Sequence, residues 1–184
     1  MDRRELLRCI AALTGAAFVG ADRVDAAVTD SDAYTPAQIA LLDEIAETIL
    51  PRTDTPGAKD AQVGAYIARY SAACYKPADF AILRAGLGDI DARSRKIHGA
   101  EFVKCTGAQK QKLLVDIDAE AKRHAGEPKA SDDRPAHWFT LCKQLTLLGF
   151  FTSEAGATRV ARYRPVPGHY KGVVAYHGET FWAW

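Results

Sequence analysis

The sequence predicts an all-α fold: a compact bundle of about five to six helices, followed by an extended C-terminal tail. Apolar residues recur at helical spacing in several windows. Two of these windows open with a capping-box pattern, Thr35 to Gln38 and Thr106 to Gln109. No segment before Val173 alternates apolar and polar residues for long enough to indicate a strand. Helices packed on helices are therefore the expected architecture.

The first two helices of the bundle are separated by a turn-rich segment. Thr35 can cap the first helix, Pro36 suits its first position, and Pro51 ends it. Its inward residues are expected to be Ile39, Leu42, Ile45 and Ile49. Prolines, threonines and a glycine in residues 51–57 indicate a loop. A second helix over 61–75 is expected to turn one face inward, with Val63, Ile67, Tyr70 and Cys74.

The third and fourth helices follow the same logic. Pro77 opens the third, and its inward residues are expected to be Phe80, Leu83, Leu87, Ile90 and Ile97. Thr106 caps the fourth, with Leu113, Leu114, Ile117 and Ala121 facing the core. The polar residues 126–135 then predict an exposed loop.

The fifth helix, expected over 136–151, is apolar on most of its circumference. Such a helix is central to a core or is covered by a partner. Ser153 can cap a short sixth helix that ends near Val160. Prolines and glycines exclude a helix after Tyr163, so residues 164–184 are expected to form the extended tail.

The N-terminal residues indicate export. Arg3 and Arg4 precede an apolar run of 13 residues, and Val24-Asp25-Ala26 fits a small-residue cleavage site. The run is too short for a membrane-spanning helix, which needs about 20 apolar residues. We therefore expect residues 1–26 to be a twin-arginine signal peptide and residues 27–184 to be one exported domain. The alternative is an N-terminal amphipathic helix that happens to contain two arginines.

Large aromatic side chains near the C-terminus favour a protein interface, because they are costly to leave in water. The alternative is that the tail folds back and packs on its own helices. The interface candidates are Trp138, Phe150, Phe151, Pro165, Pro167, Tyr170, Phe181, Trp182 and Trp184.

The sequence predicts no catalytic, cofactor-binding or metal-ligating residues in this chain. Gly86 and Gly88 lack the third glycine and the preceding strand of a dinucleotide-binding loop. The five histidines show no metal-ligand spacing. The net charge of +1 and the lack of a basic patch argue against binding to nucleic acid.

Three cysteines, Cys74, Cys105 and Cys142, remain after the expected cleavage. In an oxidising compartment an odd number suggests one internal disulfide with a leftover thiol, or a disulfide to another chain. The alternative is three buried free thiols that behave as small apolar side chains.

Three blocks of sequence carry a resemblance to a known family. They are residues 49–58 (ILPRTDTPGA), residues 145–156 (LTLLGFFTSEAG), and Tyr163 with residues 165–172 (PVPGHYKG). In this order, behind an export signal, they resemble the small subunit of gluconate 2-dehydrogenase, called subunit 3. Many relatives have a cysteine just after the last block, where this chain has Val173. No disulfide at that position is therefore transferred from the family.

The resemblance implies a non-catalytic partner of a large flavoprotein. Members of the family associate with a FAD-dependent dehydrogenase subunit of the glucose–methanol–choline type, and often with a multihaem cytochrome c subunit. The large subunit oxidises a sugar, sugar acid or glycoside. It typically lacks its own signal and is exported by the twin-arginine translocase together with the small subunit. The expected location is the periplasm, where a cytochrome partner could associate the complex with the membrane.

Two other functions remain open. The chain could be an independent exported enzyme that uses His137, His169 or His177 as acid–base groups. It could also be an assembly chaperone that leaves its partner after export.

Overall fold

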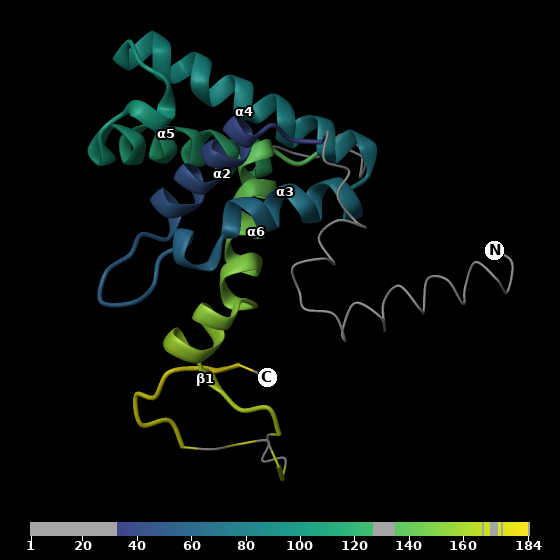
Figure 1. Ribbon diagram of the computed structural model, residues 1–184, viewed down its shortest axis with the longest axis vertical. Coiled ribbons are helices and arrows are strands. Elements are labelled where there is room, and N and C mark those ends of the chain that lie inside the picture. The colour runs from purple at the N-terminus through teal and green to yellow at the C-terminus, as the bar shows by residue number, and fades with distance from the viewer. Residues whose placement is uncertain (1–32, 127–134, 167, 170–172, 174, 184) are drawn as a thin grey trace, which may run out of the picture. The chain divides into compact units, whose positions relative to one another are not determined.

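The computed structural model describes residues 33–126, 135–166, 168–169, 173 and 175–183 (Figure 1). Residues 34–184 belong to one compact unit. The expected signal peptide, including Arg3 and Arg4, lies outside the described residues.

Helix α2 (Pro36–Ile49) begins as the sequence predicts. The Thr35 hydroxyl accepts a hydrogen bond from the Gln38 N–H at 3.2 Å, and the Gln38 side chain accepts one from the Thr35 N–H at 2.9 Å. This reciprocal pair is the predicted capping box. The helix ends at Ile49, two residues before Pro51, and its buried residues are Leu41, Leu42, Ile45 and Ala46.

Helix α3 (Val63–Cys74) turns a slightly different face inward from the one predicted. Val63 and Ile67 are buried as expected, but Ser71 takes the next inward position and Cys74 is exposed. The Ser71 hydroxyl donates to the Ile67 carbonyl at 2.7 Å and lies 3.1 Å from the Tyr34 hydroxyl. A serine with its hydrogen bonds satisfied can occupy a core position, which a search for apolar residues alone does not find.

Helix α4 (Pro77–His98) buries Leu83, Leu87 and Ile90 as predicted, but Ile97 is 60% exposed. The inward position near its end belongs to Ser94, whose hydroxyl donates to the Ala100 carbonyl at 2.8 Å. The chain then passes through the 3₁₀ turn η3 (Phe102–Lys104), where Phe102 is fully buried. The prediction for Ile97 was wrong because the last turn of α4 extends past the core.

Helix α5 (Gly107–Gly126) confirms the predicted capping box and the predicted core face. The Thr106 N–H donates to the Gln109 side chain at 2.9 Å, and the Gln109 N–H donates to the Thr106 hydroxyl at 3.4 Å. Its buried residues are Leu113, Leu114, Ile117 and Ala121.

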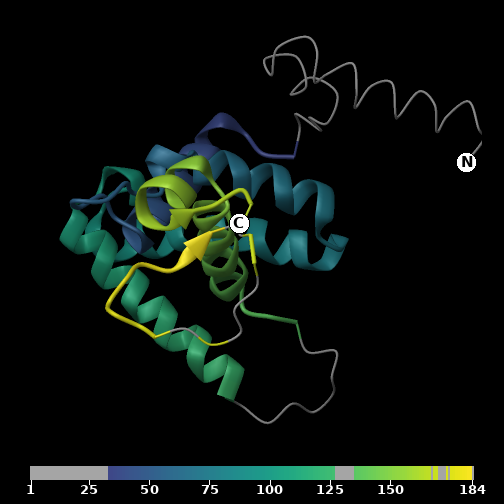
Figure 2. The same cartoon turned by 90° about the horizontal axis from the view of Figure 1, so that it is seen from below.

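Helix α6 (Trp138–Phe151) is the central helix of the bundle. It contacts α2, α3, α4 and α5, and Figures 1 and 2 show those helices around it. Of the two settings that the sequence left open for this apolar helix, the centre of a core or a surface covered by a partner, the contacts of α6 show the first. Its buried residues are Trp138, Phe139, Leu141, Cys142, Leu145, Thr146, Gly149 and Phe150.

The chain after α6 forms a short helical turn and then a returning tail. The turn η4 (Gly156–Val160) has π-helical geometry, and the Ser153 hydroxyl accepts the Gly156 N–H at 3.1 Å. Strand β1 (Arg162–Tyr163) pairs in parallel with β2 (Trp182–Ala183), with Arg162 opposite Trp182. The sequence did not predict a strand before Val173, because two residues are too few to show alternation. The fold remains an all-α bundle with an added two-residue pairing.

Candidate functional site

The C-terminal half of α6 leaves three large apolar side chains open to solvent. Leu147, Leu148 and Phe151 are 39%, 41% and 36% exposed. Their spacing of three and four residues places them on one face of the helix. The helix that is otherwise the centre of the core therefore ends in an uncovered apolar stripe.

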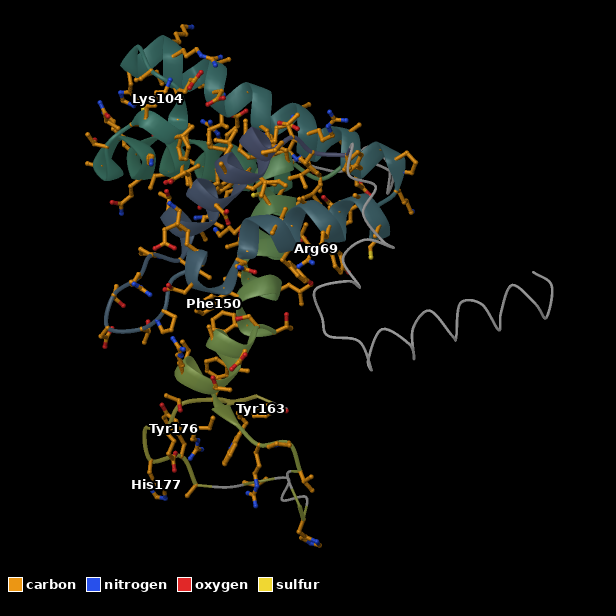
Figure 3. The ribbon with its side chains drawn as sticks, viewed as in Figure 1. Arg69, Lys104, Phe150, Tyr163, Tyr176 and His177 are labelled. Atoms are coloured by element: carbon orange, nitrogen blue, oxygen red, sulfur yellow. The ribbon has the colours of Figure 1, made fainter. Side chains whose placement is uncertain are left out.

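The returning tail extends this stripe. The Arg162 N–H donates to the Phe181 carbonyl at 2.9 Å, which fixes the two ends of the tail together. The Phe181 ring meets the Phe151 ring edge-on, with centroids 5.4 Å apart. Phe181 and Trp182 are 52% and 42% exposed, and Tyr163 is exposed on the neighbouring strand (Figure 3). We call the combined patch the α6–tail surface; it consists of Leu147, Leu148, Phe151, Tyr163, Phe181 and Trp182.

The predicted interface residues divide into three groups. Trp138 and Phe150 are 7% and 3% exposed, so the bundle itself removes them from water. Phe151, Phe181 and Trp182 lie on the α6–tail surface, and Pro165 is exposed nearby in the chain. Pro167, Tyr170 and Trp184 lie outside the described residues.

Sequence reasoning did not name Leu147, Leu148 or Tyr163 among the interface candidates. The positions of the two leucines around the axis of α6 could have indicated their exposure. Leu147, Leu148 and Phe151 share a face that does not coincide with the face of Phe139, Cys142 and Thr146. A helix that is apolar on all sides hides this distinction until its neighbours are known.

Two arginines flank the aromatic end of the α6–tail surface. The Arg162 guanidinium carbon lies 3.9 Å from the Trp182 ring centroid, and that of Arg164 lies 6.0 Å from it. Arg162 also donates through Nε to the Thr180 carbonyl at 3.2 Å. Among the described residues, neither guanidinium lies within salt-bridge distance of a carboxylate. This pair therefore presents positive charge beside an apolar patch.

An exposed loop between α2 and η2 (Lys59–Ala61) is held in one conformation by two carboxylates. The Glu47 carboxylate accepts the N–H groups of Arg52 and Lys59 at 2.9 and 2.8 Å. The Asp60 carboxylate accepts the Gly57 N–H at 2.8 Å and pairs with the Arg52 guanidinium, and these two partners hold the pKa of Asp60 below its usual range. A Cβ on Gly57 would lie 2.6 Å from the Arg52 nitrogen, so glycine is required there.

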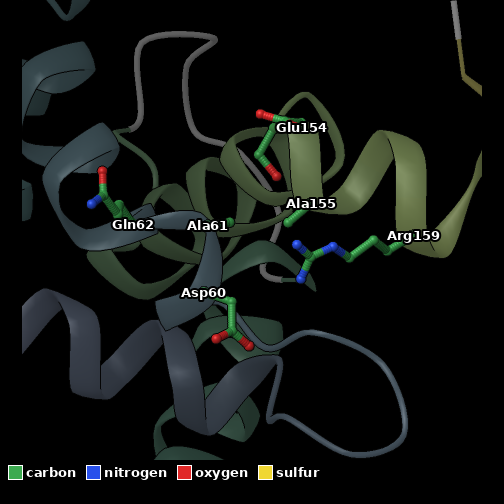
Figure 4. A pocket seen from close by; sticks show the side chains of 7 residues that line it. Asp60, Ala61, Gln62, Glu154, Ala155 and Arg159 are labelled. Atoms are coloured by element: carbon green, nitrogen blue, oxygen red, sulfur yellow. The ribbon is translucent and has the colours of Figure 1, made fainter.

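A cavity of about 260 Å³ lies where this loop meets η4. Asp60 and Gln62 line one side, and Ser153, Glu154 and Arg159 line the other. Figure 4 shows the Arg159 side chain extending from η4 toward Asp60. The structure thus places residues 60–62, which follow the first block of the family resemblance, beside Ser153 and Glu154 of the second block, although they are about 90 residues apart in the chain. The cavity wall mixes both charges and does not form an arrangement of nucleophile, base and orienting group.

A second cavity, of about 350 Å³, surrounds the start of α6. His137 is the N-cap of α6, and its Nδ1 accepts the Phe139 N–H at 3.2 Å. Its ring lies 5.8 Å from that of His124, and its Nε2 lies 3.8 Å from the Glu120 carboxylate. Burial lowers the pKa of His137 below its usual value, although Glu120 acts in the opposite direction. His137 is therefore held as a neutral helix cap.

The other two histidines considered for acid–base chemistry, His169 and His177, are both exposed in the tail. Among the described residues no contact joins either of them to His137. The structure therefore does not assemble the three histidines into one site.

The three cysteines are free thiols in the structure. Cys105 and Cys142 are buried, and burial raises the pKa of Cys142 to about 12. Cys74 is exposed on α3. Of the alternatives that the cysteine count left open, the structure shows unpaired thiols, and Cys74 is the one that another chain could reach.

The described residues give no support for a dinucleotide-binding loop, a metal site or a membrane-spanning helix. Gly86 and Gly88 lie inside α4, where Gly86 makes room for the Trp138 indole ring instead of a phosphate. No group of three or more His, Cys, Asp or Glu side chains in the described part could hold a metal ion. No helix in that part is long and apolar enough to cross a membrane.

Comparison with known proteins identifies the family. The family described as gluconate 2-dehydrogenase subunit 3 matches residues 36–168, which include α2 to η4 and the start of the tail. No curated protein and no solved structure matches the chain. Because the matched residues make up well over half of the chain, the protein belongs to the gluconate 2-dehydrogenase subunit 3 family.

Proposed function

We propose that this chain is the small, non-catalytic subunit of an exported dehydrogenase complex, in which it accompanies and stabilises a larger flavoprotein subunit. The large subunit would be a FAD-dependent enzyme of the glucose–methanol–choline type that oxidises a sugar, sugar acid or glycoside. A multihaem cytochrome c would be a third subunit. The complex would work in the periplasm.

The α6–tail surface is the observation that supports this proposal. Aromatic and large aliphatic side chains gathered in one exposed patch are typical of protein interfaces, and tryptophan and arginine are enriched among the residues that contribute most to binding. Leu148, Phe151 and Trp182 together with the flanking arginines fit that description. A large subunit that covers this patch would remove the exposed rings from water.

The N-terminal arginines give the same subunit a second role. The twin-arginine pathway carries folded proteins, so a large subunit without a signal could cross the membrane while bound to this chain. Export and stabilisation would then depend on the same interface. The proposal would also account for the expected export signal on a chain that matches a dehydrogenase subunit.

The test is to express the large subunit with and without this chain and to measure flavin-dependent dehydrogenase activity in each cell fraction. We expect soluble, periplasmic activity only when both chains are present. Changing Arg3 and Arg4 together to lysine should leave the complex active but cytoplasmic, because lysines do not replace the twin-arginine pair. A large subunit that is soluble, active and periplasmic without this chain would contradict the proposal.

The independent-enzyme alternative is tested with the same material. Its structural support is the cavity beside His137, with His124 and Glu120 in its wall. We expect the purified chain alone to show no dye-linked oxidation of sugars. Activity in the isolated chain, lost in a His137→Asn variant that remains folded, would favour the enzyme over the subunit.

A further inference from the structure

The two arginines at the edge of the α6–tail surface have an electrostatic feature that packing does not explain. Both guanidinium groups lie near the same indole ring, at 3.9 Å for Arg162 and 6.0 Å for Arg164. The negative face of an aromatic ring attracts a cation, but two like charges around one ring also repel each other. A nearby anion would relieve that repulsion.

Among the described residues, no carboxylate forms a salt bridge with either guanidinium, but Glu179 attracts Arg162 at longer range; after the hydrogen bond from the His177 N–H, this attraction is one of the causes that lower the pKa of Glu179. The neighbouring acid in sequence, Glu179, accepts the His177 N–H at 2.9 Å and lies outside salt-bridge distance of both guanidiniums. The other charged side chains described between Ala155 and Ala183 are Arg159, Arg162 and Arg164. With Glu154, the acid immediately before this range, and Glu179 included, the described part of this end has a small excess of positive charge, and Arg162 and Arg164 lie together at its aromatic edge.

A partner that covers the α6–tail surface would increase the free-energy cost of leaving the two guanidiniums without an anion. Arg162 and Arg164 adjoin Tyr163 in the chain and Trp182 in space, so a partner that buries those rings also removes water from the guanidiniums. A buried cation is costly unless it is paired and hydrogen-bonded. Arginine is suited to such a pair because its planar fork binds a carboxylate through two parallel hydrogen bonds.

We propose that Arg162 and Arg164 bind carboxylate side chains of the large subunit, so that the docking site on that subunit is an apolar patch edged with Asp or Glu. This inference depends on the proposed function and adds the chemistry of the partner surface. It also gives the two ends of the interface different roles. The apolar stripe on α6 would contribute affinity, and the arginine pair would contribute orientation and rate of association.

Arg164 provides the cleaner variant because Arg162 has a second, structural role. The backbone N–H and the Nε of Arg162 both hold the returning tail, through Phe181 and Thr180. Arg164 has no hydrogen bond to another described residue. Arg164→Gln therefore removes the charge without releasing the tail, and Arg162→Lys keeps the charge while losing the planar fork and the Nε hydrogen bond to Thr180.

The experiment measures the dissociation constant between the full chain and the co-expressed large flavoprotein subunit, from 0.05 to 0.5 M NaCl. The test variants are R164Q, R162K and the double variant R162Q/R164Q. The control is K96Q/K112Q, which removes the same charge from exposed positions on α4 and α5. At 0.15 M NaCl we expect the dissociation constant to rise about 10-fold for R164Q and R162K and about 100-fold for R162Q/R164Q. The control should stay within about threefold of the wild type, and the double variant should show a weaker dependence on salt.

Each other outcome has a definite meaning. If no flavoprotein binds the wild-type chain, the proposed function fails and this inference fails with it. If the flavoprotein binds the wild type and R162Q/R164Q equally well, the proposed function survives and the carboxylate partner is wrong. Vesicles of phosphatidylglycerol and phosphatidylcholine provide the last arm. One result would overturn the inference: the wild type binds these vesicles, the double variant does not, and the substitutions leave the complex unaffected. The arginine pair would then bind an anionic membrane surface instead of the large subunit.

Discussion

The two halves of α6 are both rich in apolar residues but have different surroundings. In the N-terminal half, Trp138, Phe139 and Cys142 lie among the surrounding helices and are almost fully buried. In the C-terminal half, Leu147, Leu148 and Phe151 form an exposed stripe, and the Phe181 ring contacts Phe151. The bundle therefore buries one half of its central helix and leaves part of the other half uncovered.

This difference separates stability from binding along one helix. Apolar side chains in the first half contribute to folding, because they leave water whenever the bundle forms. Those in the exposed stripe gain most of that contribution only when another molecule covers them. The same type of residue is thus expected to affect unfolding at one end of α6 and partner affinity at the other.

The largest expected effect comes from the same substitution at both ends of the helix. Phe139→Ala should lower the free energy of unfolding by about 3–5 kcal/mol, because it leaves a cavity in a well-packed core. Phe151→Ala should lower it by only about 1 kcal/mol, because the ring already contacts water. Urea unfolding of the full chain, followed by circular dichroism, measures both. Equal losses at the two positions would show that the halves of α6 do not differ as described.

The next effect concerns binding, for which a substitution in the C-terminal half of α6 is expected to matter more than one in the N-terminal half. Leu148→Asp should change the free energy of unfolding by less than about 1 kcal/mol, but it should weaken the complex with the large subunit about 100-fold by placing a charge in the apolar stripe. The matched control is Val115→Asp on α5, because Val115 is also an exposed apolar residue, at 60%. The control should bind like the wild type. If both variants bind normally, the stripe is not the docking site.

Features that depend on a few consecutive residues can be predicted from the sequence, and features that depend on distant residues cannot. Capping boxes at Thr35 and Thr106 and the apolar face of α5 are properties of a few consecutive residues, and the structure confirms them. The position of Ser71 depends on Tyr34, which is 37 residues away. The exposed face of α6 likewise depends on where four other helices end, and this does not follow from periodicity alone.

In the candidate site, too, some residues could be named from the sequence and others depend on contacts between distant segments. The aromatic residues at its centre could be named from the sequence because exposed rings are costly, and Phe151, Phe181 and Trp182 do lie at the surface. Arg162 and Arg164 could not be named, because their position over Trp182 arises from the parallel pairing of β1 with β2. That pairing joins residues about 20 positions apart through only two residues on each strand.

The smallest expected effect is a dependence on pH at the buried end of α6. His137 caps this end through Nδ1, which must be unprotonated to accept the Phe139 N–H. Burial lowers its pKa in the folded state, His124 and Arg93 act in the same direction, and Glu120 opposes them. Because the folded-state pKa lies below the unfolded value of about 6.5, the contribution of this cap to stability is complete above that pH and is lost as the pH falls through the folded-state pKa.

His137→Asn tests this contribution, because asparagine is a good helix cap and does not titrate. We expect the variant and the wild type to have similar free energies of unfolding at pH 7.5, and the variant to be about 1 kcal/mol more stable at pH 5. His177→Asn, at an exposed position in the tail, is the control and should follow the wild type throughout. The difference between variant and wild type isolates His137, because the carboxylates that titrate near pH 5 are common to all three proteins. Parallel pH profiles for the wild type and His137→Asn would mean that the start of α6 does not depend on the charge of its cap. The contrast between the two halves would then rest on apolar packing alone.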